Sequence, residues 1–140
     1  MKKILTTIVG VAAAIMLFFQ GAGVANVAFA ANYTAASVKQ SQFEAGIYGN
    51  NNNGDEIAVA LYNTGSKNIA FITDGKVSFY DTYTITPTTL DGASNAQYFN
   101  IGGVTFTYFE IGKDMYILTD DGDIYAVGEL SAYEAEQIRK

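Results

Sequence analysis

Apolar and polar residues alternate along most of the chain from Gln42 onward, with a period of two. Alternation at every second position is typical of strands that bury one face and expose the other. The first two apolar series are Phe43, Ala45 and Ile47, followed by Ile57, Val59 and Leu61. We therefore expect strands, rather than helices, to build most of the domain.

Turn sequences divide the alternating region into eight predicted strands. Asp74-Gly75, Gly102-Gly103 and Asp121-Gly122 each separate two alternating runs, as tight hairpin turns do. Asp74-Gly75 predicts a type I′ turn, in which both central residues have positive φ. We expect Gly49–Asp55 to be a polar loop and Thr86–Ala96, which contains the only proline, to be a long connection.

Short strands joined mostly in hairpin order predict an all-β fold, an antiparallel meander that closes into a small up-and-down barrel. A two-sheet sandwich is the alternative, with the chain crossing between sheets at the long connection. Ser131-Ala132-Tyr133-Glu134 matches a capping box and predicts a short C-terminal helix. Residues 42–140 are expected to form a single all-β domain, preceded by residues 31–41 as a tether or a loosely packed arm.

The first part of the chain, residues 1–30, has the pattern of a secretory signal peptide. Lys2 and Lys3 precede an uncharged stretch from Ile4 to Phe19, and Ala28-Phe29-Ala30 supplies small residues at a cleavage site. An uncleaved membrane anchor is the alternative, which the Ala-x-Ala ending disfavours. We expect cleavage after Ala30, secretion to the extracellular space, and no stable membrane insertion of the mature protein.

The composition excludes several classes of partner, metal site and catalytic mechanism. The chain has 8 Lys and Arg against 14 Asp and Glu, with no His and no Cys. The short Lys-Lys signal and the absence of Cys favour a bacterial exported protein. An acidic protein without a basic patch is not expected to bind nucleic acid. The missing His and Cys exclude thiolate and imidazole metal sites, Ser-His-Asp triads and cysteine nucleophiles. Asp120–Asp123 departs from the calcium-binding EF-hand pattern, which needs a glutamate at the position of Gly128. We expect no cofactor and no metal.

Carboxylates interrupt two apolar strand faces. Asp81 and Tyr83 lie on the apolar face of one predicted strand, and Tyr108 and Glu110 lie on that of another. A carboxylate that faces an apolar interior must be hydrogen-bonded or paired, or its pKa rises. One hypothesis is that these four residues form a small ligand-binding pocket. The alternative is structural, with Asp81 at a bulge or bonded to a tyrosine, and Glu110 at a strand end in solvent.

These observations favour a secreted, non-catalytic β-barrel that binds a small ligand or an extracellular partner. An alternative is a protein-binding inhibitor or adhesion module that uses tyrosines predicted to face outward, namely Tyr48, Tyr62, Tyr80, Tyr116 and Tyr125. A cavity in the barrel would favour small ligands, and a filled interior would favour surface recognition. A third hypothesis is a glycosidase using Asp81 and Glu110, which requires two carboxyl groups about 5–9.5 Å apart.

Overall fold

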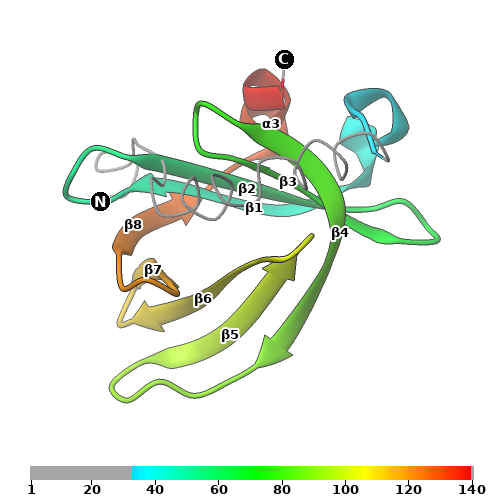
Figure 1. Ribbon diagram of the computed structural model, residues 1–140. Coiled ribbons are helices and arrows are strands. Elements are labelled where there is room, and N and C mark those ends of the chain that lie inside the picture. The colour runs from blue at the N-terminus through cyan, green and yellow to red at the C-terminus, as the bar shows by residue number, and fades with distance from the viewer. Residues whose placement is uncertain (1–32, 140) are drawn as a thin grey trace.

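The chain folds into a closed barrel of eight antiparallel strands with a short C-terminal helix, as the computed structural model in Figure 1 shows. The structure describes residues 33–139. Each strand pairs with the next along the chain, and β1 also pairs with β8, which closes the barrel. The predicted barrel is confirmed, and the sandwich is not adopted. The elements are β1 (Phe43–Asn50), β2 (Glu56–Asn63), β3 (Asn68–Thr73), β4 (Ser78–Pro87), β5 (Ser94–Ile101), β6 (Val104–Ile111), β7 (Asp114–Thr119), β8 (Ile124–Glu129) and α3 (Ala132–Arg139).

The predicted signal peptide, residues 1–30, lies outside the described residues. Among residues 33–139, no helix is long and apolar enough to cross a membrane. The segment expected to be a tether or a loosely packed arm contains two short 3-10 turns, η1 (Ala35–Ser37) and η2 (Gln40–Gln42). Between them Val38 is completely buried, so this part of the arm packs against the barrel.

The predicted polar loop Gly49–Asp55 is shorter in the structure, because β1 continues through Asn50. Gly49 pairs with Val127 of β8, and a Cβ atom at Gly49 would lie 1.9 Å from the carbonyl oxygen of Ala126. Only glycine permits such a close approach between strands. The loop prediction was wrong at Gly49 because this contact joins residues that are far apart in the sequence.

The predicted long connection Thr86–Ala96 is also shorter. The end of β4 pairs with β5, in a register that joins Pro87 to Gln97, so only residues 88–93 connect the two strands. Proline has no N–H to donate to the ladder, and it is found near strand ends more often than inside a central strand. Immediately afterwards the backbone N–H of Thr88 donates to the carbonyl oxygen of Ala96 at 3.0 Å.

The hairpin at Asp74-Gly75 forms, but not with a type I′ turn. Gly75 has a φ of 89°, whereas Asp74 does not adopt positive φ. Its carboxylate Oδ1 instead accepts hydrogen bonds from the backbone N–H groups of Lys76 and Val77, each at 2.8 Å. The predicted turn type was wrong because an aspartate side chain can satisfy turn N–H groups in a different backbone conformation.

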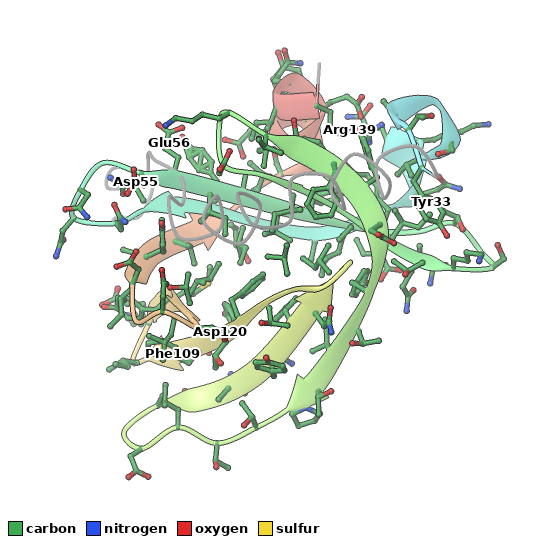
Figure 2. All side chains as sticks on the ribbon, viewed as in Figure 1. Tyr33, Asp55, Glu56, Phe109, Asp120 and Arg139 are labelled. Atoms are coloured by element: carbon green, nitrogen blue, oxygen red, sulfur yellow. The ribbon has the colours of Figure 1, made fainter. Side chains whose placement is uncertain are left out.

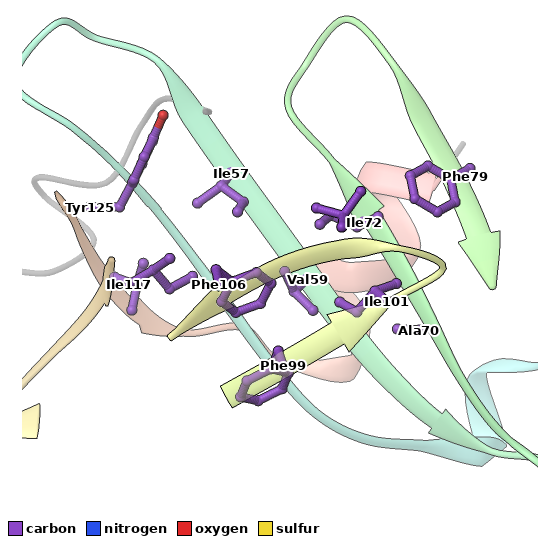
Figure 3. Packing of buried hydrophobic residues seen from close by; sticks show 12 residues of the cluster. Ile57, Val59, Ala70, Ile72, Phe79, Phe99, Ile101, Phe106, Ile117 and Tyr125 are labelled. Atoms are coloured by element: carbon purple, nitrogen blue, oxygen red, sulfur yellow. The ribbon is translucent and has the colours of Figure 1, made fainter. Parts of the chain in front are cut away.

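The main hydrophobic core lies inside the barrel (Figure 3). The rings of Phe99 and Phe106 stack near its centre, with centroids 4.9 Å apart and planes 11° apart. This confirms the predicted inward facing of Ile57 and Val59. Phe43 was predicted to share the face of Ala45 and Ile47, and this was wrong, because the register of β1 shifts between Phe43 and Ala45 and Phe43 packs outside the barrel. The buried members are Ile57, Val59, Ala70, Ile72, Phe79, Phe99, Ile101, Val104, Phe106, Ile117, Tyr125 and Val127.

A second hydrophobic cluster lies outside the barrel, where α3 and the N-terminal segment cover β2, β3 and β4 (Figure 1). Arg139 joins the two covering segments (Figure 2), and its side chain is only 3% exposed. Its guanidinium carbon lies 4.9 Å from the ring centre of Tyr62 and 5.5 Å from that of Tyr80. It also donates to the carbonyl oxygens of Ala35 at 3.1 Å and Val38 at 2.5 Å.

The predicted capping box begins α3. The backbone N–H of Ser131 donates to Oε1 of Glu134 at 2.9 Å, and the backbone N–H of Glu134 donates to the Ser131 hydroxyl oxygen at 3.1 Å. Ala135, one turn into the helix, is buried in the outer cluster. The helix therefore begins where the sequence predicts and docks through its small apolar side.

Candidate functional site

The two ends of the barrel carry different connections between strands. The end that we call closed carries the turns at residues 51–55, 74–77, 102–103 and 120–123. The end that we call open is where β1 begins and β8 ends, and it carries the connections at residues 64–67, 88–93 and 112–113.

Four buried polar side chains lie at the closed end, one beside each turn: Asn51, Asp74, Asp81 and Thr119. Oδ1 of Asn51 accepts hydrogen bonds from the backbone N–H groups of Asn53 and Asp55, at 2.9 and 3.0 Å. Its amide group donates to the Tyr125 hydroxyl inside the barrel at 3.2 Å. The Thr119 hydroxyl accepts from the backbone N–H of Asp123 at 3.0 Å. These side chains satisfy backbone donors of their own turns and so stabilise the closed end.

Asp81 is bonded locally in the same manner. It is 8% exposed, and its Oδ1 accepts the backbone N–H of Thr82 at 2.7 Å. Its Oδ2 lies against the third turn, where a Cβ atom on Gly102 would be only 2.6 Å away. The chain from Gly102 to Glu110 is nearly all extended, at about 3.3 Å per residue, so the Asp81 and Glu110 carboxylates are on the order of 20 Å apart.

At the open end, the barrel interior contains a cavity of about 400 Å³. Small-molecule sites occupy about 300–1,000 Å³, so the volume suits one small organic molecule. Seven of the eight strands contribute to the lining, all except β3. The larger apolar lining residues are Ile47, Val59, Leu61, Ile85, Phe99 and Met115. The polar ones are Asn95, Gln97, Tyr108, Glu110 and Glu129.

The strands sort the lining residues by depth. On β6, Glu110 lies near the open end, Tyr108 is two residues further in, and Phe106 beyond it is fully buried. On β5 the same order runs from Asn95 at the mouth to Phe99, which is 5% exposed. Inward-facing residues of a strand recur at every second position, so this order follows from the alternation. The result is a cup with polar groups at its mouth and aromatic rings at its floor.

A hydrogen-bonded network holds the Glu110 carboxylate at the mouth. The Tyr108 hydroxyl donates to Oε2 of Glu110 at 2.5 Å, and the Asn95 amide donates to Oε1 at 2.7 Å. Burial raises the pKa of Tyr108 well above its usual value, and the hydrogen bond to Glu110 and the charges of Glu110 and Glu129 raise it further. Tyr108 is therefore a stable donor at neutral pH, and it orients the carboxylate without neutralising its charge.

Asn95 reaches Glu110 because β5 is irregular at this point. The register between β5 and β6 shifts between Ser94 and Gln97, which is the mark of a bulge. Asn95 has a φ of 51° and is the single non-glycine residue with positive φ among residues 33–139. Asparagine tolerates this left-handed conformation better than most residues. The bulge turns the Asn95 amide toward the carboxylate.

The structure divides the four residues that the sequence singled out. Tyr108 and Glu110 meet in the cavity, as the pocket hypothesis requires. Tyr83 is half-buried and packs against the interior core, but it does not line the cavity. Burial and the nearby charge of Glu44 raise its pKa. Asp81 belongs to the closed end.

Three polar residues of the cavity were missed in the sequence: Asn95, Gln97 and Glu129. Asn95 and Gln97 fall in or beside the connection that was predicted to be a loop, and no local signal marks the bulge. Glu129 could have been identified, because it shares a period-two series with Tyr125 and Val127, which the structure places in the interior. The sequence analysis predicted that Tyr125 faces outward, and this was wrong. In the structure the outward residue is the apolar Ile124, which is 52% exposed.

The predicted surface of outward tyrosines is largely absent. Tyr62 and Tyr80 do face outward, but α3 and Arg139 cover them, at 0% and 7% exposure. Tyr125 is completely buried inside the barrel. Tyr116 is half-buried and stacks on Phe109, with ring centroids 5.3 Å apart.

Within residues 33–139 no group of three acidic, histidine or cysteine side chains is arranged to hold a metal ion. The chain matches no family model, no curated protein and no solved structure. The candidate site is therefore defined by its own geometry, a cavity at the open end with one oriented carboxylate at its mouth.

Proposed function

We propose that this protein is a secreted, non-catalytic binding protein that holds a small, largely apolar molecule in the open half of its barrel. The export pattern of residues 1–30 supports secretion. The single observation that carries the binding role is the cavity of about 400 Å³, apolar in its depth and polar at its mouth. Binding sites for small molecules typically combine apolar walls with a few placed polar groups.

Surface recognition through tyrosines has less support. Recognition surfaces use exposed aromatic side chains, and the tyrosines expected to serve that role include three at 7% exposure or less. The more exposed ones, Tyr98 at 37% and Tyr133 at 68%, lie on β5 and α3 respectively. Because Tyr62, Tyr80 and Tyr125 are buried, they cannot join these two in an exposed recognition surface.

A glycosidase using Asp81 and Glu110 also has little support. The two carboxylates lie at opposite ends of the barrel, on the order of 20 Å apart by strand length. The mechanism needs them within about 9.5 Å of each other, on either side of one sugar linkage.

The binding role is tested with N-phenyl-1-naphthylamine, a neutral apolar dye whose fluorescence rises in apolar surroundings. We expect saturable binding of one dye molecule per protein. Ala45 lines the mouth of the cavity and pairs with Leu61 across the strands, so Ala45→Phe should plug the cup and abolish binding. Thr107→Phe adds the same ring on the outer face of β6, outside the cavity lining, and should leave binding unchanged. Binding that is absent from the wild type, or insensitive to the plug, would overturn the proposal.

A further inference from the structure

We propose that the molecule held in the open half of the barrel is a cationic amphiphile, an ammonium-type group attached to an aliphatic or aromatic body. This inference rests on the proposed function and names the chemical class of ligand for the same cavity.

The first observation is the sign of the charge at the mouth. Among residues 33–139, the cavity lining includes the carboxylates of Glu110 and Glu129 and no basic side chain. The basic residues on turns of the open end, Lys67 and Lys113, are exposed and lie outside the lining. Clefts lined by one sign of charge concentrate ligands of the opposite sign.

The second observation is that Glu110 has neutral partners. Its two hydrogen-bond donors, the Tyr108 hydroxyl and the Asn95 amide, orient the carboxylate but carry no charge. A ligand that fills the cup would cover this carboxylate and remove it from water. Covering a carboxylate is costly unless a positive charge pairs with it. A neutral ligand leaves that cost uncompensated, and an anion adds repulsion.

The third observation is a second hollow beside the first. It has a volume of about 440 Å³ and lies outside the barrel, between the start of β1 and the start of α3. It shares Ala45, Gly46 and Glu129 with the cavity and adds the carboxylates of Glu44 and Glu134. In the described part of the chain, no basic residue lines this hollow either. An approaching cation therefore meets negative charge on its way to the mouth.

The depth order gives the orientation of the ligand. Its apolar body would extend toward Val59 and Phe99 at the floor of the cup, and its cation would stay beside Glu110 and Glu129 at the mouth. Both ends of such a molecule find complementary surroundings, which is the arrangement that fixes one binding orientation.

The test compares three probes that share a ten-carbon chain and differ in their head group: decylammonium, decanol and decanoate. Isothermal titration calorimetry at pH 7, below the aggregation concentration of each probe, measures the three dissociation constants. We expect decylammonium to bind about tenfold more tightly than decanol, the typical effect of a charge-assisted hydrogen bond. Decanoate should bind most weakly.

Two variants test whether the cavity carboxylates cause this preference. Glu110→Gln keeps one of the two acceptor oxygens and removes the charge, so decylammonium and decanol should then bind almost equally. Glu129→Gln should reduce the preference by a smaller factor, and it serves as the second test if Glu110→Gln does not fold. Asp91→Asn is the matched control, because Asp91 is an exposed carboxylate in a connection at the same end, outside both linings.

The outcomes separate this inference from the proposed function. If all three probes bind equally, or decanoate binds best, the cationic ligand is ruled out while the apolar cup stands. If the preference persists in both glutamine variants, or Asp91→Asn removes it, the cavity carboxylates are not its source and the inference fails. If neither the dye nor any ten-carbon probe binds, the binding role fails as well.

Discussion

At the closed end the barrel interior is filled by Ile57, Phe79 and Tyr125, each at 2% exposure or less, whereas at the open end Ile47 and Ile85 surround a cavity of about 400 Å³. Both ends are formed by the same strands with the same alternation. The difference lies in what the inward positions hold and how the connections are closed. Aromatic rings and bonded turn side chains seal one end, and shorter apolar chains with acidic residues leave the other open.

This contrast shows that alternation determines which residues face inward but not whether they fill the space. A closed barrel of eight strands has an interior that is just wide enough for side chains to fill, or to hold one small ligand. Here each half of one barrel follows one of these outcomes. Stability is expected to reside mainly in the closed half, and ligand binding in the open half.

The largest expected effect comes from shortening an isoleucine in each half. Ile57→Ala should lower the free energy of unfolding by about 2–5 kcal/mol, because Ile57 is fully buried and leaves a void. Ile85→Ala should cost about 1 kcal/mol, since Ile85 is half-exposed and the space it leaves joins an existing cavity. Urea denaturation measures both. Equal losses would mean that the two halves are packed alike.

The next largest loss of stability is expected from a substitution at Gly75, in a turn of the closed end. Its φ of 89° strains any residue with a Cβ atom, so Gly75→Val should lower stability by about 1–2 kcal/mol. Lys76→Val is the control, because Lys76 is exposed in the same turn and does not have positive φ. Thermal unfolding compares the two variants. An unchanged melting temperature for Gly75→Val would show that the closed-end turn is not as described.

A buried carboxylate in the same turn should give a smaller effect that depends on pH. Burial raises the pKa of Asp74, although backbone hydrogen bonds from Val77 and Lys76 partly oppose the rise. The folded protein therefore holds this proton more tightly than the unfolded chain does. Stability is lost as pH rises from the unfolded pKa through the folded pKa, and it is fully recovered below the unfolded pKa.

Asp74→Asn keeps the Oδ1 acceptor and removes the titration. The variant should be slightly more stable than the wild type at pH 7, and the gap should close at low pH, below the unfolded pKa of an aspartate. Denaturation curves between pH 3 and 7 measure this difference. Asp91→Asn, which removes an exposed carboxylate from another connection, is the control variant. An Asp74→Asn protein that is less stable than the wild type at pH 7 would contradict a raised pKa for Asp74.

The smallest effect concerns the bulge at the open end. Asn95→Gly should leave stability within about 0.5 kcal/mol of the wild type, because glycine adopts positive φ without strain and this offsets the lost hydrogen bond. Asn95→Ala keeps the strain and should cost about 1 kcal/mol more. Both variants should weaken decylammonium binding, since both remove one of the two donors that orient the Glu110 carboxylate. Equal stability of the two would show that the backbone at Asn95 is relaxed.

Much of the fold could be predicted from the sequence, because it follows from local patterns. The inward positions of Ile57 and Val59 follow from alternation, and the start of α3 follows from its capping box. The need for glycine at position 49 and the burial of Tyr62 could not be predicted from local patterns. Gly49 is required by the backbone of β8, and Tyr62 is buried by a helix that docks from the other end of the chain.

About half of the candidate site could be predicted from the sequence, because only part of it follows from local patterns. Tyr108 and Glu110 lie two residues apart on one strand, so their shared face follows from the period of two. Their partner Asn95 depends on a bulge, and bulges shift the facing of every later residue without a reliable sequence signal. Asp81 has the same inward position as predicted, but which end of the barrel it seals depends on the turn at Gly102.

If the open half of the barrel is a ligand cup, methyl NMR should detect bound ligand in that half of the interior. Titration of isotope-labelled protein with N-phenyl-1-naphthylamine reports on isoleucine and methionine methyl groups in both halves. We expect shifts at Ile47, Ile85 and Met115, which line the cavity, and none at Ile57 or Ile72, which pack in the closed half. Shifts confined to Ile57 and Ile72, or to the outward Ile111 and Ile124, would contradict it.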